Sequence, residues 1–215
     1  MPGTPQLTGR FLDAVALAQE LQGGERRSGT GIPFLSHLLV VTGLVIEDGG
    51  DEDEAIAALL HDTVEGGGGR PLLKRIERDF GARVARIVEL LSDTLDGPSQ
   101  LPWVELKARY LGQLEACEDE GTLRVALSDK LHNARSIVRD YRYEGHAIWE
   151  RFTEKTAQEQ LWYSTQLVEL FARKRPGALA ADLRNAVEEL AALIAADEQE
   201  SDEPYLPGEP GGSGR

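Results

Sequence analysis

Residues 55–69, AIAALLHDTVEGGGG, join an apolar helical pattern to three ionisable side chains and four consecutive glycines. The apolar residues recur with the spacing of a core helix, and the run ends at His61, Asp62 and Glu65. Burying ionisable groups is costly unless they are paired or bind a metal. The stretch therefore predicts a core helix that carries a functional site and stops after Glu65. We expect the glycines to form a loop rather than a phosphate-binding turn.

The segments on either side show the same 3.6-residue spacing, and alternating strand patterns are hard to find. This periodicity predicts an all-α fold. Ser36 is expected to cap a buried helix over about 37–47, and Asp51 to cap the helix of the opening stretch. Thr156 and Glu159 form a capping-box pattern before another helix. The remaining helices are expected near residues 11–21, 70–80, 82–93, 102–114, 122–141, 160–174 and 177–193.

Length and composition indicate one folded domain followed by a tail. The chain has 215 residues, of which 41% are hydrophobic and 28% charged, as is ordinary for a globular protein. We expect a single helical domain over 1–197 and a disordered acidic, Pro/Gly-rich tail over 198–215. Cys117 is the only cysteine, which fits a reducing compartment. No secretory or membrane-spanning pattern is present, so we expect a cytoplasmic protein.

The formal net charge is −14, and no dense basic cluster interrupts it. Such a surface repels polyanions, so we expect neither DNA nor RNA nor an anionic membrane as a partner. A small anionic ligand remains compatible, because a pocket can be positive inside an acidic protein. The oligomeric state is left open by the sequence.

His37, His61, Asp62 and Asp129 form the candidate metal site. They lie on three separate apolar helical segments, and imidazoles and carboxylates meeting in a helical core are the ligand types of a divalent-metal site. Each piece alone has a plainer reading. A lone histidine at a helix end is more often a core residue, and an isolated Asp129 fits a solvated or arginine-paired acid equally well.

Four stretches together resemble the HD-domain phosphohydrolases, specifically the RelA/SpoT-type alarmone hydrolases and their small stand-alone relatives. They are GIPFLSHLLVV, ALLHDTVEGGG, IERDFGARVARIVELLSDT and LRVALSDKLHNARSIVRDY. The resemblance implies an all-helical HD-domain bundle in which His37, His61, Asp62 and Asp129 bind a divalent metal, usually Mn²⁺. It also implies removal of the 3′-pyrophosphate from guanosine 3′,5′-polyphosphates, giving GDP or GTP and pyrophosphate.

The resemblance further implies roles for residues around the metal. Glu65 is expected to orient or deprotonate the attacking water. The nucleotide is expected to contact the following residues: Arg26, Arg27, Arg109, Lys130 and Asn133. The family motif usually has an acid after this glutamate, whereas this chain has Gly66. Two alternatives therefore stay open: a phosphohydrolase of another nucleotide, including adenosine alarmones, and a metal- and nucleotide-binding module with little turnover.

Overall fold

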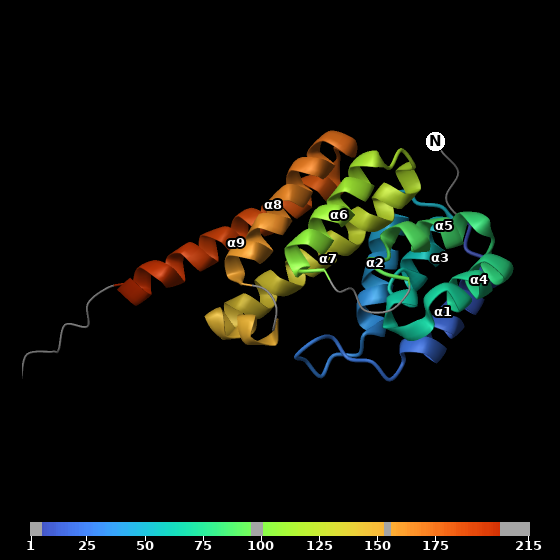
Figure 1. Cartoon of the computed structure of the whole chain (residues 1–215), viewed down its shortest axis with the longest axis horizontal. Coiled ribbons are helices and arrows are strands. Elements are labelled where there is room, and N and C mark those ends of the chain that lie inside the picture. The colour runs from blue at the N-terminus through green and yellow to red at the C-terminus, as the bar shows by residue number, and fades with distance from the viewer. Residues whose placement is uncertain (1–5, 96–100, 153–155, 203–215) are drawn as a thin grey trace, which may run out of the picture.

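The computed structural model describes residues 6–95, 101–152 and 156–202, and the chain forms a bundle of helices over these residues (Figure 1). The α-helices are α1 Gly9–Gln22, α2 Leu35–Glu47, α3 Glu52–Leu60, α4 Gly69–Phe80, α5 Ala82–Leu91, α6 Trp103–Ala116, α7 Glu120–Glu144, α8 Ala157–Lys174 and α9 Ala178–Asp202. A π-helical turn, η1, spans Val64–Gly68, and a 3₁₀ segment, η2, spans Gly145–Arg151. The prediction of an all-α fold is confirmed.

The long helix α7 lies at the centre of the bundle. It packs against α2, α3 and α5 on one side and against α8 and α9 on the other, as the two groups of helices in Figure 1 show. Leu127 and Leu131 of α7 are fully buried in the main apolar core. Because α7 is covered on more than one side, a polar side chain on it, such as Asp129, is carried into the interior.

Most of the predicted helix boundaries agree with the structure. The Asp51 carboxylate accepts a hydrogen bond from the Glu54 amide at the start of α3, and Thr156 and Glu159 form the predicted capping box of α8. Gly81 ends α4 with a φ of 96°, a left-handed conformation that favours glycine. The capping residues and Gly81 therefore predicted the starts of α3 and α8 and the end of α4 correctly.

The prediction that Ser36 caps α2 is wrong. The helix begins at Leu35, and Phe34 at the cap position already has helical backbone angles. The Ser36 amide donates to the Pro33 carbonyl at 3.0 Å, so the first turn is initiated at the proline, whose φ is preset for a helix. Ser36 therefore lies inside the first turn, where it cannot act as the cap.

The glycine run also differs from expectation. The helix that was expected to extend to Glu65 ends at Leu60, and residues 64–68 form the π-helical turn η1 that leads directly into α4. Glycine has no side chain to crowd such a wide turn. At Gly69 φ is 48°, and a Cβ atom would lie 2.7 Å from the Leu95 carbonyl oxygen. The glycines thus shape a compact turn instead of a loop.

A buried ion-pair network fixes the start of α3. Glu54 is 4% exposed, and its carboxylate accepts from Arg83 of α5 at 2.8 Å and from Arg124 of α7. The network joins three helices at the end of α3 opposite His61. It therefore helps to set the position of that histidine relative to α7.

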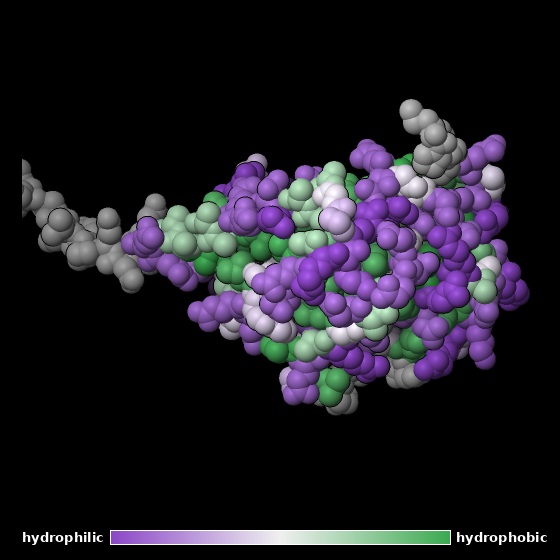
Figure 2. Space-filling model, turned by 90° about the horizontal axis from the view of Figure 1, so that it is seen from above, coloured by the Kyte–Doolittle hydropathy of each residue, from purple (hydrophilic) through white to green (hydrophobic). Residues whose placement is uncertain are grey.

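Helix α9 continues to Asp202, five residues past the boundary expected at 197, and residues 203–215 of the expected tail lie outside the described part of the chain. Hydrophilic side chains cover most of the face in Figure 2, and apolar residues show between them at several places, including the part of α9 toward its C-terminal end. Among the described residues, no helix is sufficiently long and apolar to span a lipid bilayer.

Candidate metal centre and adjoining cavity

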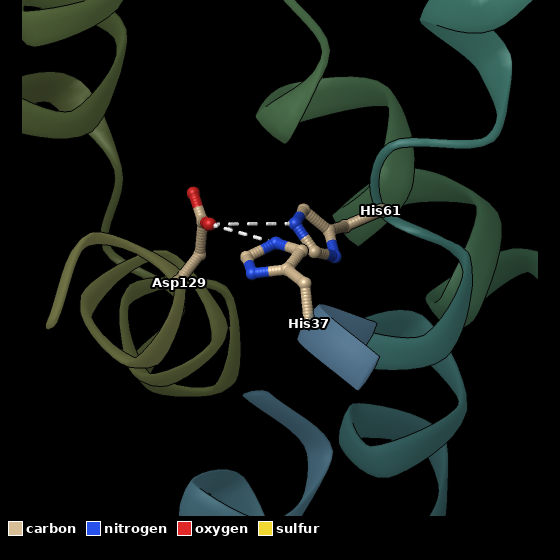
Figure 3. Close-up of side chains that lie close together, drawn as sticks. All are labelled: His37, His61 and Asp129. Carbon is tan, nitrogen blue, oxygen red and sulfur yellow. Dashed lines mark ion pairs between the residues drawn. The ribbon is translucent and has the colours of Figure 1, made fainter. Parts of the chain in front are cut away.

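Three helices bring His37, His61 and Asp129 together in the interior (Figure 3). His37 comes from the first turn of α2, His61 directly follows α3, and Asp129 lies near the middle of α7. The Oδ1 atom of Asp129 is 3.3 Å from His37 Nε2 and 3.6 Å from His61 Nε2. Each of the three residues is at least 95% buried, with exposures of 1%, 2% and 5% respectively.

Asp62 completes the group from the side nearer to solvent. Its Oδ2 atom lies 3.5 Å from His37 Nε2 and 3.2 Å from His61 Nε2. The four side chains predicted to share a metal therefore converge, with both imidazoles presenting Nε2 to both carboxylates.

The hydrogen bond at Nδ1 of each imidazole determines whether Nε2 carries a hydrogen or a lone pair. His61 Nδ1 lies 2.8 Å from the Ala58 carbonyl oxygen, which can only accept, so Nδ1 carries the hydrogen. Nε2 of the neutral ring then carries a lone pair, and this buried atom has no hydrogen-bond partner among the described residues. His37 Nδ1 likewise has a partner, His132 Nδ1, at 2.7 Å.

This donor set fits a divalent cation. Lone pairs of two imidazoles and two carboxylates face one another, an arrangement that a shared positive charge stabilises. Adjacent ligand atoms around an ion with bonds of about 2.1 Å lie about 3 Å apart. The separations of 3.2–3.6 Å between Nε2 and carboxylate oxygens are close to that value.

The electrostatics of the cluster agree with a cation site. Burial disfavours a charged His61, but Asp62 and Asp129 outweigh burial and raise the pKa of His61 well above its usual value, because a proton on Nε2 supplies the positive charge that a bound cation would otherwise supply there. Burial likewise opposes ionisation of Asp129, yet the charge of Lys130 and the two histidines hold the pKa of this carboxyl well below its usual range. The carboxylates are thus ionised at neutral pH and attract positive charge.

Three of the expected nucleotide-binding residues lie next to the cluster. Lys130 Nζ donates to Asp129 Oδ2 at 2.7 Å, and Asn133 Nδ2 donates to Asp129 Oδ1 at 2.7 Å. Arg27 Nη2 in turn donates to Asn133 Oδ1 at 3.1 Å. One chain of hydrogen bonds therefore connects the loop before α2 to the carboxylate of Asp129, a candidate metal ligand.

These residues line a cavity of about 250 Å³ beside the cluster. Its lining includes Arg27, Trp103, Lys107, Lys130, Asn133 and Tyr163. Cationic side chains and aromatic rings share the wall, a combination suited to phosphate groups and a planar base. Three cationic side chains, Arg27, Lys107 and Lys130, therefore line a cavity of an otherwise acidic protein.

Arg26 and Arg109 do not belong to this lining. The Arg26 side chain donates to the carbonyls of Gly24 and Glu25 on the surface, and Arg109 is exposed on α6. On the same helix, Lys107 faces the cavity, with Nζ 5.7 Å from the Tyr163 ring centroid and paired with Asp93. Lys107 rather than the expected Arg109 is therefore the cation of α6 that lines the cavity.

Glu65 lies in η1, three residues after Asp62. Its carboxylate accepts a hydrogen bond from the Asp93 backbone amide. The residue is exposed on one side, but loss of hydration next to the surrounding protein raises the pKa of its carboxyl to about 7. The negative charges of Asp93 and Asp62 contribute to this increase. A carboxyl with a pKa near neutrality is well matched to proton transfer at physiological pH.

Several side chains of this site, including His132, Lys107, Trp103 and Tyr163, were not among the expected site residues. His132 is one helical turn after Asp129, and Lys107 shares a helical face with Trp103, Tyr110 and Leu114. Both spacings are visible in the sequence. They place a residue on the inner face of its helix, but they do not show which neighbour that face meets.

Comparison with known proteins agrees with this geometry. The HD domain family matches residues 14–158. The guanosine-3′,5′-bis(diphosphate) 3′-pyrophosphohydrolase MESH1 of Xenopus tropicalis is 32% identical over 161 residues, which cover 74% of this chain and 82% of that protein. Human MESH1 is 31% identical over 162 residues, covering 74% and 83% of the two chains.

A solved structure shares the fold. It belongs to a metazoan orthologue of SpoT described as hydrolysing ppGpp, and it superposes with a TM-score of 0.67 over 86% of this chain and 97% of its own. The two sequences are 20% identical in that superposition, so the likeness concerns the helical architecture.

Proposed function

The chain belongs to the HD-domain family, and from this premise we propose that it is a metal-dependent hydrolase of guanosine 3′,5′-polyphosphates. The reaction removes the 3′-pyrophosphate, so that ppGpp or pppGpp gives GDP or GTP and pyrophosphate. The observation that carries the proposal is the convergence of His37, His61, Asp62 and Asp129 beside a cationic cavity. Two relatives that carry this activity in their names support the substrate class.

His37, His61, Asp62 and Asp129 would hold the divalent ion, which we propose to be Mn²⁺ in a cytoplasmic protein. When bound, the ion supplies Lewis acidity that draws charge from phosphoryl oxygens and acidifies water. The two carboxylates are ligand types that suit Mn²⁺. Lys130 and Asn133 hold the Asp129 carboxylate from the cavity side, so its orientation is fixed before an ion arrives.

The remaining polar residues act on substrate and water. Arg27, Lys107 and Lys130 bring three positive charges to the cavity wall, where they neutralise the phosphate groups of the nucleotide. Glu65 takes the proton of the attacking water, since its carboxyl has a raised pKa and is anchored by the Asp93 amide. Trp103 and Tyr163 offer aromatic surface to the base.

Gly66 favours one second candidate, a module that binds metal and nucleotide but turns over slowly. The family resemblance implies an acid directly after Glu65, whereas this chain has a glycine at position 66. The rate of nucleotide hydrolysis distinguishes the two candidates, since the binding module would hydrolyse its nucleotide only slowly.

The decisive experiment measures pyrophosphate release from a panel of guanosine and adenosine 3′-pyrophosphates, with added Mn²⁺ or with chelator. We expect Mn²⁺-dependent release of pyrophosphate and GDP from ppGpp, and loss of both products in an Asp129→Ala control. Efficient turnover of the adenosine compounds alone would change the substrate assignment. Tight nucleotide binding without turnover would establish the binding module.

A further inference from the structure

His132 contacts a metal-site histidine from outside the ligand group. Its Nδ1 atom lies 2.7 Å from His37 Nδ1, and the two rings are tilted by 39° with centroids 4.8 Å apart. The distance is that of a hydrogen bond between nitrogens. One of the two facing atoms must therefore donate and the other accept.

The position of His37 Nε2 decides the direction of this bond. Nε2 faces Asp129 at 3.3 Å and Asp62 at 3.5 Å, on the side where the metal would bind. An imidazole binds a metal through a lone pair, so the hydrogen of a neutral ligating His37 must lie on Nδ1. His37 then donates to His132, and His132 accepts through Nδ1.

We propose that His132 is a positioning residue, which fixes the tautomer and ring orientation of His37 by accepting its Nδ1 hydrogen. The proposal rests on the metal site of the proposed function. It assigns to an imidazole the task that a carboxylate or a backbone carbonyl usually performs behind a ligating histidine.

The second ligand histidine provides an internal comparison. His61 Nδ1 meets the Ala58 carbonyl oxygen at 2.8 Å, within its own helical turn. That acceptor is backbone and is present whatever the side chain at position 58. In the described part of the chain, the Nδ1 atom of His37 has instead a side-chain partner on another helix, His132. Substitution can therefore remove the acceptor of His37 alone and leave the acceptor of His61 in place.

The test measures the affinity of the purified protein for Mn²⁺ alone, by calorimetric titration without nucleotide. His132→Phe keeps a ring of similar size but cannot accept, whereas His132→Asn places an amide oxygen near the position of Nδ1. We expect His132→Phe to bind Mn²⁺ about 10- to 100-fold more weakly, as is typical when the partner of a ligand is lost. His132→Asn is expected to recover most of this loss. His146→Phe, an exposed histidine outside the cluster, is the matched control and should bind as the wild type does.

Each other outcome argues against the proposal. Unchanged Mn²⁺ affinity in His132→Phe would overturn the positioning role, and so would an Asn variant as weak as the Phe variant. If the Phe variant fails to fold with chelator present, as judged by circular dichroism, His132→Ala replaces it under the same criteria. Failure of the wild-type protein to bind Mn²⁺ would remove the metal site itself, a result distinct from failure of His132.

Discussion

Replacing Glu65 by Gln tests the proton-transfer step while preserving the local structure. The Glu65 carboxylate accepts the Asp93 backbone N–H, and the amide oxygen of Gln can accept the same hydrogen bond. The new side chain has nearly the same shape but cannot take a proton from water. Metal affinity and nucleotide affinity should therefore stay within a few-fold of the wild-type values.

The expected loss follows from the neighbouring acids. Asp62 belongs to the candidate metal site, and the Asp93 carboxylate is paired with Lys107, so neither is free to replace Glu65. Loss of a positioned general base lowers kcat by roughly 10²- to 10⁴-fold, or about 3–5 kcal/mol in the activation barrier. Single-turnover pyrophosphate release from ppGpp with saturating Mn²⁺ measures this quantity.

The pH dependence is an independent test of Glu65. Activity should fall as pH is lowered, whereas the contribution of Glu65 to stability should fall as pH is raised. Wild-type activity should fall as pH drops through the pKa of Glu65, which is about 7 without metal and lower beside a cation, and the Gln variant should lack this step. The folded pKa is raised, so the contribution of Glu65 to stability is full below about 4.5 and is lost as pH rises through about 7. In chelator at pH 8, Glu65→Gln should therefore unfold at a slightly higher temperature than the wild type. Unchanged turnover with an unchanged pH profile would refute the role of Glu65 as the base.

Three further substitutions test other parts of the molecule. His61→Ala should lose bound Mn²⁺ and activity together, as measured by metal analysis and pyrophosphate release; a full complement of metal would contradict the ligand assignment. Lys107→Met should raise KM for ppGpp about tenfold or more because a cavity cation is lost, whereas its helix neighbour Arg109→Met should not; equal effects would remove Lys107 from the substrate site. Arg124→Met leaves the buried Glu54 with one partner fewer and should lower stability by about 3 kcal/mol, or roughly 6–12 °C in Tm by calorimetry, and an unchanged Tm would show that the ion pair is dispensable.

Two local signals in the sequence, the Ser36 cap and the glycine run, were outweighed by neighbouring residues. Ser36 is a good cap residue, but Pro33 begins the turn three residues earlier and leaves Ser36 inside it. Four glycines ordinarily favour a loop, yet η1 and α4 continue the helical path because the packing around Leu95 selects a backbone that glycine alone adopts easily. In both cases the competing residue can be read from the sequence. The sequence does not show whether its effect on the backbone outweighs that of the cap residue or of the glycines.

The sequence by itself determined the all-α class, most helix ends and the four candidate metal ligands. These follow from the 3.6-residue period, from capping side chains, and from ionisable groups such as His61 and Asp129 placed in apolar stretches, all of which act within a few residues of chain. Only the tertiary structure decided that His132 contacts His37, and that Lys107 rather than Arg109 faces the cavity. Helical periodicity predicts which face of a helix is buried. The partner of that face comes from a helix far away in the sequence, and packing alone sets the distance between them.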